Sequence, residues 1–271
     1  MQRIYRQIKS KVRHTKGFTL VEMLVVAPLV VLVIATLVGF MITLVGNVFI
    51  SNARVQMQYD AQAALDQIEQ DAFYSTTFLS SFTPTSPQGK DNGTQAFSST
   101  NNDIIFNAPA TDKNPFDPTR QIVYYANDPS PCSGQVQVNN PLYTKTIYFL
   151  NTINGVTSLY RREIVPPNDQ SSTIGPNTTC TAPWQRNSCV SINYNSNPIC
   201  VSKDSQLVSY VSALTVAYYN KSDPSTILTD PTQADSVKIS ITVTRTIGGD
   251  TISTTMSLAA SRADTTQIIP T

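Results

Sequence analysis

The sequence predicts an α+β protein in which one long N-terminal α-helix packs on an antiparallel β-sheet domain. Three observations predict this fold: an apolar run over residues 18–50, an amphipathic stretch over residues 51–78 that lacks Pro and Gly, and alternating apolar and polar residues near the C-terminus. The amphipathic stretch has a helical period, and the C-terminal residues have the two-residue period of a strand. We therefore divide the chain into a basic leader (1–17), a transmembrane helix (18–50), its amphipathic continuation (51–78) and a β-rich exported domain (79–271).

The leader has a different charge from the rest of the chain. It holds six of the 19 Lys and Arg residues and no acid, whereas residues 18–50 hold one charge, Glu22. As a helix this apolar run would measure about 50 Å, and the hydrocarbon core of a membrane measures about 30 Å. Because the cations precede the run, the positive-inside rule predicts a single-pass protein with a cytoplasmic N-terminus and with everything beyond residue 50 outside.

Glu22 is the residue that a plain membrane anchor does not explain. A carboxylate inside an apolar helix costs about 2.5–3.5 kcal/mol on insertion scales, so such a group normally has a partner or a function. Cleavage after Gly17 would create a positive α-amino group on Phe18, which shares a helix face with Glu22 at a spacing of four residues. We expect this new N-terminus to neutralise Glu22, in its own chain or in a neighbour.

The residues K-G-F-T-L-V-E-M, between a basic leader and an apolar helix, resemble the class III leader of type IV pilins and type II secretion pseudopilins. The resemblance implies cleavage between Gly17 and Phe18 by a prepilin peptidase on the cytoplasmic face, with N-methylation of Phe18. It also implies that Glu22 pairs with the terminal amine of an adjacent pilin subunit during assembly. The expected location is the inner (cytoplasmic) membrane, and then a pilus or pseudopilus.

The amphipathic continuation carries a single apolar stripe. Its members recur at spacings of three and four residues: Met57, Ala61, Leu65, Ile68 and Ala72. Such a stripe is typical of a helix that lies against a globular domain. We therefore expect one helix from Phe18 to about Tyr74, with its second half packed on the exported domain.

The exported domain is rich in turns and short apolar alternations, which predicts strands. The candidates are residues 104–107, 121–126, 146–150, 158–164 and 212–220, followed by a C-terminal pair over 237–243 and 252–258. Asn154-Gly155 predicts a hairpin with a somewhat long connection, and Gly248-Gly249-Asp250 predicts the turn of the C-terminal pair. The long helix, the segment SYVSALTVAYYN and the hairpin VKISITVTRT together resemble minor pilins of the PilW type and the J-type minor pseudopilin.

The four cysteines, Cys132, Cys180, Cys189 and Cys200, all follow the transmembrane helix, where an oxidising environment favours disulfides. Four cysteines allow three connectivities, and their spacing does not choose among them. We favour Cys180 with Cys189 and Cys132 with Cys200. A zinc site is the alternative, but the chain has no C-x-x-C pair and its one histidine, His14, lies in the leader. We expect no metal and no cofactor.

Three further groups have both a structural and a functional interpretation. Asp112, Asn114 and Asp117 offer oxygen ligands for calcium, but Asx side chains beside Pro more often cap turns, which we favour. The sequence Tyr160-Arg161-Arg162, with Tyr143 and Tyr148 nearby, could contact DNA, but we favour an exposed strand edge. Trp184 could be an adhesive contact, but a single aromatic does not make a carbohydrate site, so we favour packing.

These observations favour a structural subunit over an enzyme. Without the leader the chain has no histidine, and it has no phosphate-binding loop and no G-x-S-x-G motif. An exported region of about 190 residues is larger than a repetitive shaft subunit needs, which favours a minor pilin or pseudopilin that primes or caps a filament. The alternative is a tip adhesin or DNA-uptake pilin, whose exported domain would bind a surface ligand or DNA.

Overall fold

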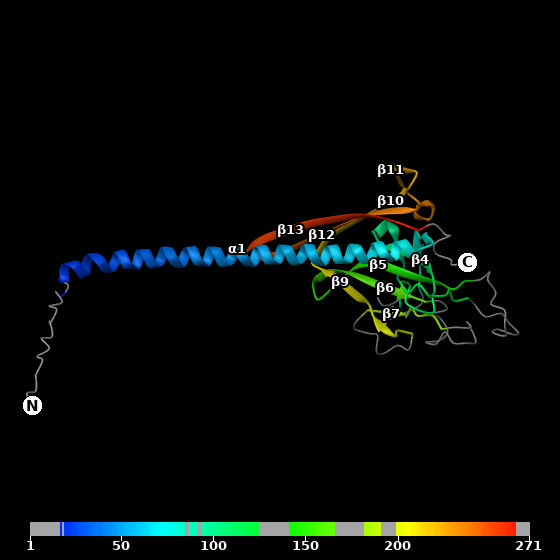
Figure 1. Ribbon diagram of the computed structural model, residues 1–271, viewed down its shortest axis with the longest axis horizontal. Coiled ribbons are helices and arrows are strands. Elements are labelled where there is room, and N and C mark those ends of the chain that lie inside the picture. Colours follow the sequence, from blue (N-terminus) through cyan, green and yellow to red (C-terminus); the bar gives the residue numbers. More distant parts are fainter. Residues whose placement is uncertain are drawn as a thin grey trace, which may run out of the picture. The chain divides into compact units, whose positions relative to one another are not determined.

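The computed structural model describes residues 17, 19–84, 87–90, 94–124, 141–165, 182–190 and 199–263. Its contacts divide the chain into two compact units, Met1–Ser51 and Asn52–Thr271. The main element in both is helix α1, Leu20–Tyr74, and the second unit adds two antiparallel sheets (Figure 1). The predicted α+β class, with one long helix and antiparallel sheets, is confirmed.

In the first unit, α1 is an apolar helix with no buried face. Its side chains are exposed from Leu20 to Phe49, and Pro28 lies inside the helix without ending it. The mean hydropathy of its most apolar 18-residue window is 2.8, and none of that window is buried. By length and composition, this helix is the one candidate membrane span within the described part of the chain.

In the second unit, α1 buries the predicted apolar stripe. Met57, Ala61, Leu65, Ile68 and Ala72 are all buried, and Ala64 joins them. The helix ends at Tyr74, as predicted, because the Ser75 amide and hydroxyl both donate to the Ala72 carbonyl and stop the regular ladder. Residues 77–78 form strand β1 instead, which corrects the boundary of the amphipathic segment.

The larger sheet has five strands in the order β1-β4-β5-β6-β9, all antiparallel. Their bounds are Thr77–Phe78, Ile104–Pro109, Tyr143–Ile153, Val156–Ile164 and Ser205–Ser209. The second sheet has the order β11-β10-β12-β13. Its strands are Asp223–Leu228, Val211–Asn220, Ser236–Ile247 and Asp250–Ser261.

Four short strands form two small pairs. Strand β2, Ser81–Phe82, pairs antiparallel with β3, Phe97–Ser98, and β7, Ser188–Cys189, pairs parallel with β8, Ser202–Lys203. Two short 3-10 helices, Ser99–Asn101 and Pro231–Gln233, connect longer elements. The strand predicted over residues 121–126 does not form within its described part, residues 121–124. There Ile122 and Tyr124 make only isolated bridges, and residues 125–126 lie outside the described residues.

Both predicted hairpins are present, and both are tight. Asn154 and Gly155, with φ of 52° and 77°, are the only residues between β5 and β6, so the expected long connection is wrong. Gly248 and Gly249 likewise join β12 to β13 with φ of 62° and 97°. Two successive residues with positive φ make the turn whose twist suits a two-residue hairpin, and Asn and Gly tolerate that conformation.

The hydrophobic core forms between the buried stripe of α1 and both sheets. The main cluster combines helix residues with the inward residues of β4, β5 and β6 and with those of β10, β12 and β13. The other face of the five-stranded sheet carries a second cluster that includes Ile105, Ile147 and Phe149, which Phe97 of β3 helps to cover. The five-stranded sheet is therefore covered on both faces, so polar side chains on its central strands are buried.

Candidate functional site

The predicted processing site begins at Gly17. This residue is exposed, and a Cβ built on it would meet nothing within 4 Å. The fold itself therefore does not require glycine at this position. Phe18, the predicted site of cleavage and N-methylation, lies outside the described residues.

Glu22 takes part in a capping box at the start of α1. Its Oε2 accepts hydrogen bonds from the backbone amide and the hydroxyl of Thr19, both at 3.0 Å, and its own amide donates to Thr19 Oγ1 at 3.3 Å. This reciprocal arrangement satisfies donors that the first helical turn leaves free. The carboxylate therefore has partners within its own chain. The sequence T-L-V-E at residues 19–22 carries the S/T-x-x-E signature of this motif.

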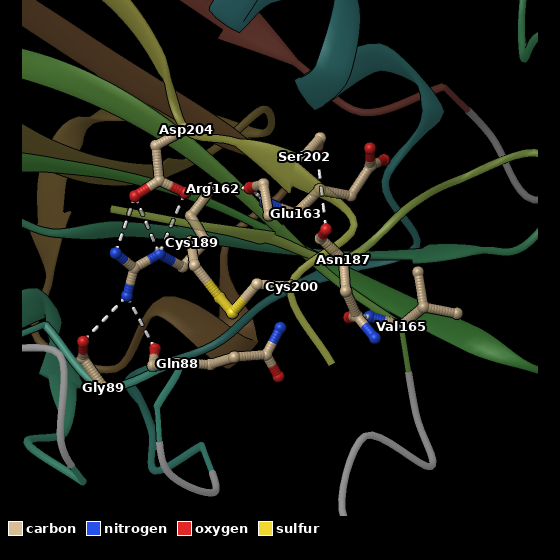
Figure 2. Close-up of a disulfide and its surroundings, with 11 residues drawn as sticks. Gln88, Gly89, Arg162, Glu163, Val165, Asn187, Cys189, Cys200, Ser202 and Asp204 are labelled. Carbon is tan, nitrogen blue, oxygen red and sulfur yellow. Dashed lines mark hydrogen bonds and ion pairs between the residues drawn. A yellow bond between two sulfur atoms is a disulfide. The ribbon is translucent and has the colours of Figure 1, made fainter. Parts of the chain in front are cut away.

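In the second unit, a disulfide joins Cys189 to Cys200 (Figure 2). The favoured pairings, Cys180 with Cys189 and Cys132 with Cys200, are therefore wrong. Cys189 is the last residue of β7, and Cys200 lies just before β8, which pairs in parallel with β7. The two Cα atoms are 5.5 Å apart, inside the range that a disulfide spans. Cys132 and Cys180 lie outside the described residues.

Beside the disulfide, Arg162 is completely buried (Figure 2). Its Nη2 lies 2.6 Å from Asp204 Oδ2, and its Nη1 donates to the carbonyls of Gln88 and Gly89 at 2.7 and 2.8 Å. Ser188 also donates to Asp204, at 2.9 Å. These bonds tie β6 to the loop at residues 87–90 and to the paired strands β7 and β8.

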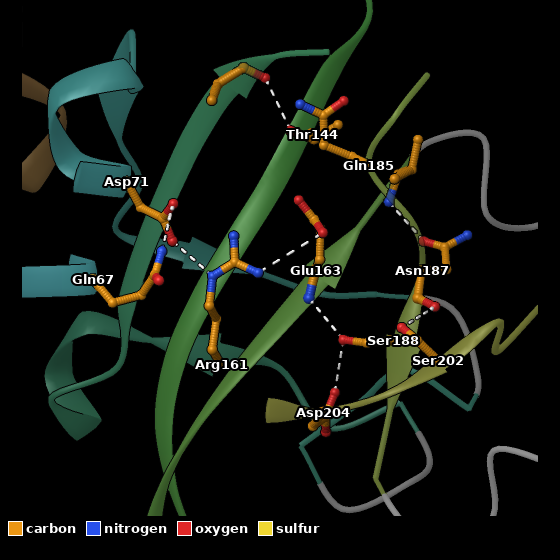
Figure 3. Close-up of polar contacts among 12 residues, drawn as sticks. Gln67, Asp71, Thr144, Arg161, Glu163, Gln185, Asn187, Ser188, Ser202 and Asp204 are labelled. Atoms are coloured by element: carbon orange, nitrogen blue, oxygen red, sulfur yellow. Dashed lines mark hydrogen bonds and ion pairs between the residues drawn. The ribbon is translucent and has the colours of Figure 1, made fainter. Parts of the chain in front are cut away.

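On the opposite face of β6, Arg161 lies between two carboxylates (Figure 3). Its Nε lies 2.7 Å from Asp71 Oδ2 in the last turns of α1, and its Nη1 lies 3.8 Å from Glu163 Oε2. The buried Tyr148 hydroxyl donates to the same oxygen of Asp71 at 2.5 Å. Burial raises the pKa of Glu163, and the positive charge of Arg161 partly offsets that rise.

These contacts correct the interpretation of Tyr160-Arg161-Arg162 as an exposed strand edge. Strand β6 pairs with β5 on one side and β9 on the other, so it is not an edge. Tyr160 is 6% exposed, and both arginines already have carboxylate partners. The arrangement therefore offers neither a free aromatic face nor free cations at this position for DNA.

The proposed calcium ligands cap turns, as favoured. Asp112 Oδ1 accepts the Gln121 amide at 2.7 Å, Asn114 Oδ1 accepts the Phe116 amide at 2.9 Å, and Asp117 Oδ1 accepts the Thr119 amide at 2.7 Å. Hydrogen bonds from Thr119 lower the pKa of Asp117. Within the described ranges, no three His, Cys, Asp or Glu side chains lie together in a group that could hold a metal ion.

No family model matches the chain, and no curated protein and no solved structure shows significant similarity to it. The class that the structure defines is an α+β protein with one exposed apolar helix near its N-terminus and a disulfide in its β domain. Its function is therefore argued from the leader motif, the helix and the side chains described above.

Proposed function

We propose that the chain is a minor pilin or pseudopilin, a structural subunit that assembles through its N-terminal helix into a type IV pilus or type II secretion-like filament. Prepilin peptidase removes residues 1–17, and Phe18 becomes the methylated N-terminus. The processed chain then remains in the inner membrane, with its second unit on the outer side of that membrane. Its role is to prime or cap the filament.

One observation carries the proposal: a basic leader, Gly17 and Glu22 stand in this order at the start of a 55-residue helix. The apolar side chains of its first unit are exposed all round, and so are available to lipid and then to other subunits. The capping box supports the role of Glu22, because two hydrogen bonds from Thr19 lower the cost of keeping its carboxylate in an apolar surrounding. The α-amine of a neighbouring subunit would complete its neutralisation.

The test is to express the full chain with and without an active prepilin peptidase and to read the N-terminus by mass spectrometry. We expect a mature chain that starts at N-methylated Phe18 only when the peptidase is present. A Gly17→Leu variant should stay uncut. Because a side chain at position 17 meets nothing in the fold, loss of cleavage there reports recognition by the peptidase and not misfolding.

Assembly is tested separately with Glu22→Gln, which keeps the size of the side chain and removes its charge. We expect this variant to be processed but excluded from filaments. Thr43→Val is the matched control, because the Thr43 hydroxyl donates to the Gly39 carbonyl of the same exposed helix. An uncut leader in the presence of peptidase that cleaves a control pilin would reduce the protein to a plain membrane anchor.

A tip adhesin is the second candidate function, and one observation favours it over DNA uptake. Phe73, Phe116 and Trp184 are between 43 and 48% exposed, whereas Arg161 and Arg162 are paired with carboxylates. Exposed aromatic side chains beside polar groups favour a ligand that stacks and accepts hydrogen bonds more than they favour a phosphate backbone.

A further inference from the structure

A small pocket lies in the second unit where helix α1 ends and the five-stranded sheet continues. Its volume is about 40 Å³, and its walls come from Asp71 and Tyr74 of α1, from residues of β4, β5 and β6, and from Thr111, Pro115, Arg120 and Gln185. A cavity of this volume has room for about two or three water molecules.

The charges that line the pocket balance. Its lining has two acidic side chains, Asp71 and Glu163, and two basic ones, Arg161 and Arg120; Figure 3 shows Arg161 between the two acids. Arg161 bridges the two acids, and the Arg120 guanidinium lies 5.0 Å above the Tyr74 ring. A balanced lining does not favour a strongly charged ligand, and it offers both donors and acceptors.

One hydroxyl of the pocket has no hydrogen-bond partner among the described residues. Thr146 is 5% exposed, lies on the helix-facing side of β5 and lines the pocket. Its neighbour Thr144 differs, because the Thr144 hydroxyl donates to the Ala108 carbonyl at 3.2 Å. The Thr146 hydroxyl is therefore open to the pocket, where it can exchange a hydrogen bond with a group that enters.

An aromatic rim, which we define as Phe73, Tyr74 and Phe116, adjoins the pocket, because Tyr74 forms part of its wall. The Tyr74 ring contacts Phe73 and Phe116 edge to face, with centroids 5.2 and 5.1 Å apart. Trp184 is attached to the same region, because its amide donates to the carbonyl of Thr111, a pocket residue, at 2.6 Å. The fold therefore brings several aromatic side chains together with Trp184, the single aromatic residue that the sequence offered as an adhesive contact.

We propose that this pocket and its aromatic rim bind one sugar residue of a neutral glycan. The pocket is too small for a whole ring, so a hydroxyl or hydroxymethyl group enters it and meets Thr146, while the C–H face of the ring stacks on Phe116. Paired carboxylates, guanidinium groups and the Gln185 amide then bond to the remaining hydroxyls. The proposal concerns the unassembled chain and holds whether or not the chain enters a filament; in a filament it would give the adhesive function.

The test titrates the full chain in lipid nanodiscs, because glycoside detergents would compete for the site. The probes are maltotetraose, cellotetraose, mannotetraose and chitotetraose, with sialyllactose and a heparin tetrasaccharide as charged comparators. Trp184 is the only tryptophan in the chain, so its fluorescence reports on this region, and calorimetry detects binding that leaves the fluorescence unchanged. We expect at least one neutral probe to bind, and to bind more tightly than both charged ones.

Two variants locate the binding site. Thr146→Val keeps the shape and removes the hydroxyl, and should weaken binding about five-fold; Phe116→Ala removes the stacking face and should weaken it about ten-fold. Thr215→Val and Ile227→Ala, on exposed positions of β10 and β11, are the matched controls and should leave the affinity unchanged. The proposal is overturned if no neutral probe binds, if a charged probe binds best, or if the pocket variants bind as tightly as the controls.

Discussion

Replacing Asp204 with Asn should strongly destabilise the second unit. Asp204 is the carboxylate that neutralises Arg162, and both side chains are no more than 1% exposed. Removing one partner of a buried pair leaves the other charge uncompensated, which costs about 3–5 kcal/mol. The carbonyls of Gln88 and Gly89 still accept hydrogen bonds from Arg162, but they carry no net charge and do not replace the carboxylate. We therefore expect the loss of stability to fall within these roughly 3–5 kcal/mol. That is a large share of the roughly 5–15 kcal/mol that stabilises a typical domain.

Thermal unfolding followed by circular dichroism and by Trp184 fluorescence measures the effect. In a unit of this size, 3–5 kcal/mol corresponds to a fall in melting temperature of about 10 °C. Asp66→Asn is the control, because Asp66 lies on the exposed face of α1, and it should change stability by less than about 0.5 kcal/mol. The double variant Arg162→Met with Asp204→Asn should be more stable than Asp204→Asn alone. A loss below about 1 kcal/mol for Asp204→Asn would refute the reasoning that the pair is sealed from water.

Three further predictions concern other parts of the chain. Replacing Cys189 and Cys200 with Ser should cost about 3 kcal/mol in chemical denaturation, because the bridge closes a loop with a sequence separation of 11. Burial lowers the pKa of Lys145 to about 8, so the folded state binds fewer protons than the unfolded state between about pH 8 and 10. The stability of the native protein relative to Lys145→Met should therefore rise over that window. Thr19→Val should speed amide exchange in the first turn of α1, because an N-cap contributes about 1 kcal/mol.

Each of these has a control that can contradict it. Reduction of the native protein should reproduce the instability of the serine variant, and a Cys180–Cys189 peptide in a non-reducing digest would contradict the observed bridge. Parallel pH profiles of native and Lys145→Met protein would show that the amine is solvated. Thr19→Ser should exchange like the native chain, and so should Thr36→Val, whose hydroxyl donates to Val33 outside the capping box.

The sequence predicted the elements whose signals are local and periodic. The stripe of α1 repeats every three or four residues, and every predicted member is buried. The C-terminal hairpin combines strict alternation with a Gly-Gly turn, and its two strands form twelve residue pairs, the first of which, Ile247 with Asp250, takes Asp250 out of the predicted turn. Helix and hairpin could be found because the information for each lies within a few neighbouring residues.

The features that the sequence did not predict depend on distant partners. Arg161 and Arg162 read as surface charges, and only Asp71 and Asp204, 90 and 42 residues away, make their burial possible. Strands β9 and β11 lack strong alternation, and spacing alone could not choose the disulfide. The aromatic rim joins Phe73 and Tyr74 to Phe116, which the fold brings together across four strands and several loops. The capping box of Thr19 and Glu22 differs from these features, because its two residues are close in the sequence and their T-x-x-E spacing identifies the motif.

Because the chain is synthesised from its N-terminus, the hydrophobic core is completed only after the last strands have been made. The stripe of α1 emerges early, yet it packs against β12 and β13, which are made last. After β13 the Ala263 amide donates to the Phe73 carbonyl, and the Arg262 side chain donates to the Thr76 carbonyl, so the end of the helix receives partners from the end of the domain. Until the final strands are available, the growing chain exposes the apolar stripe of α1, a surface of the kind that promotes aggregation.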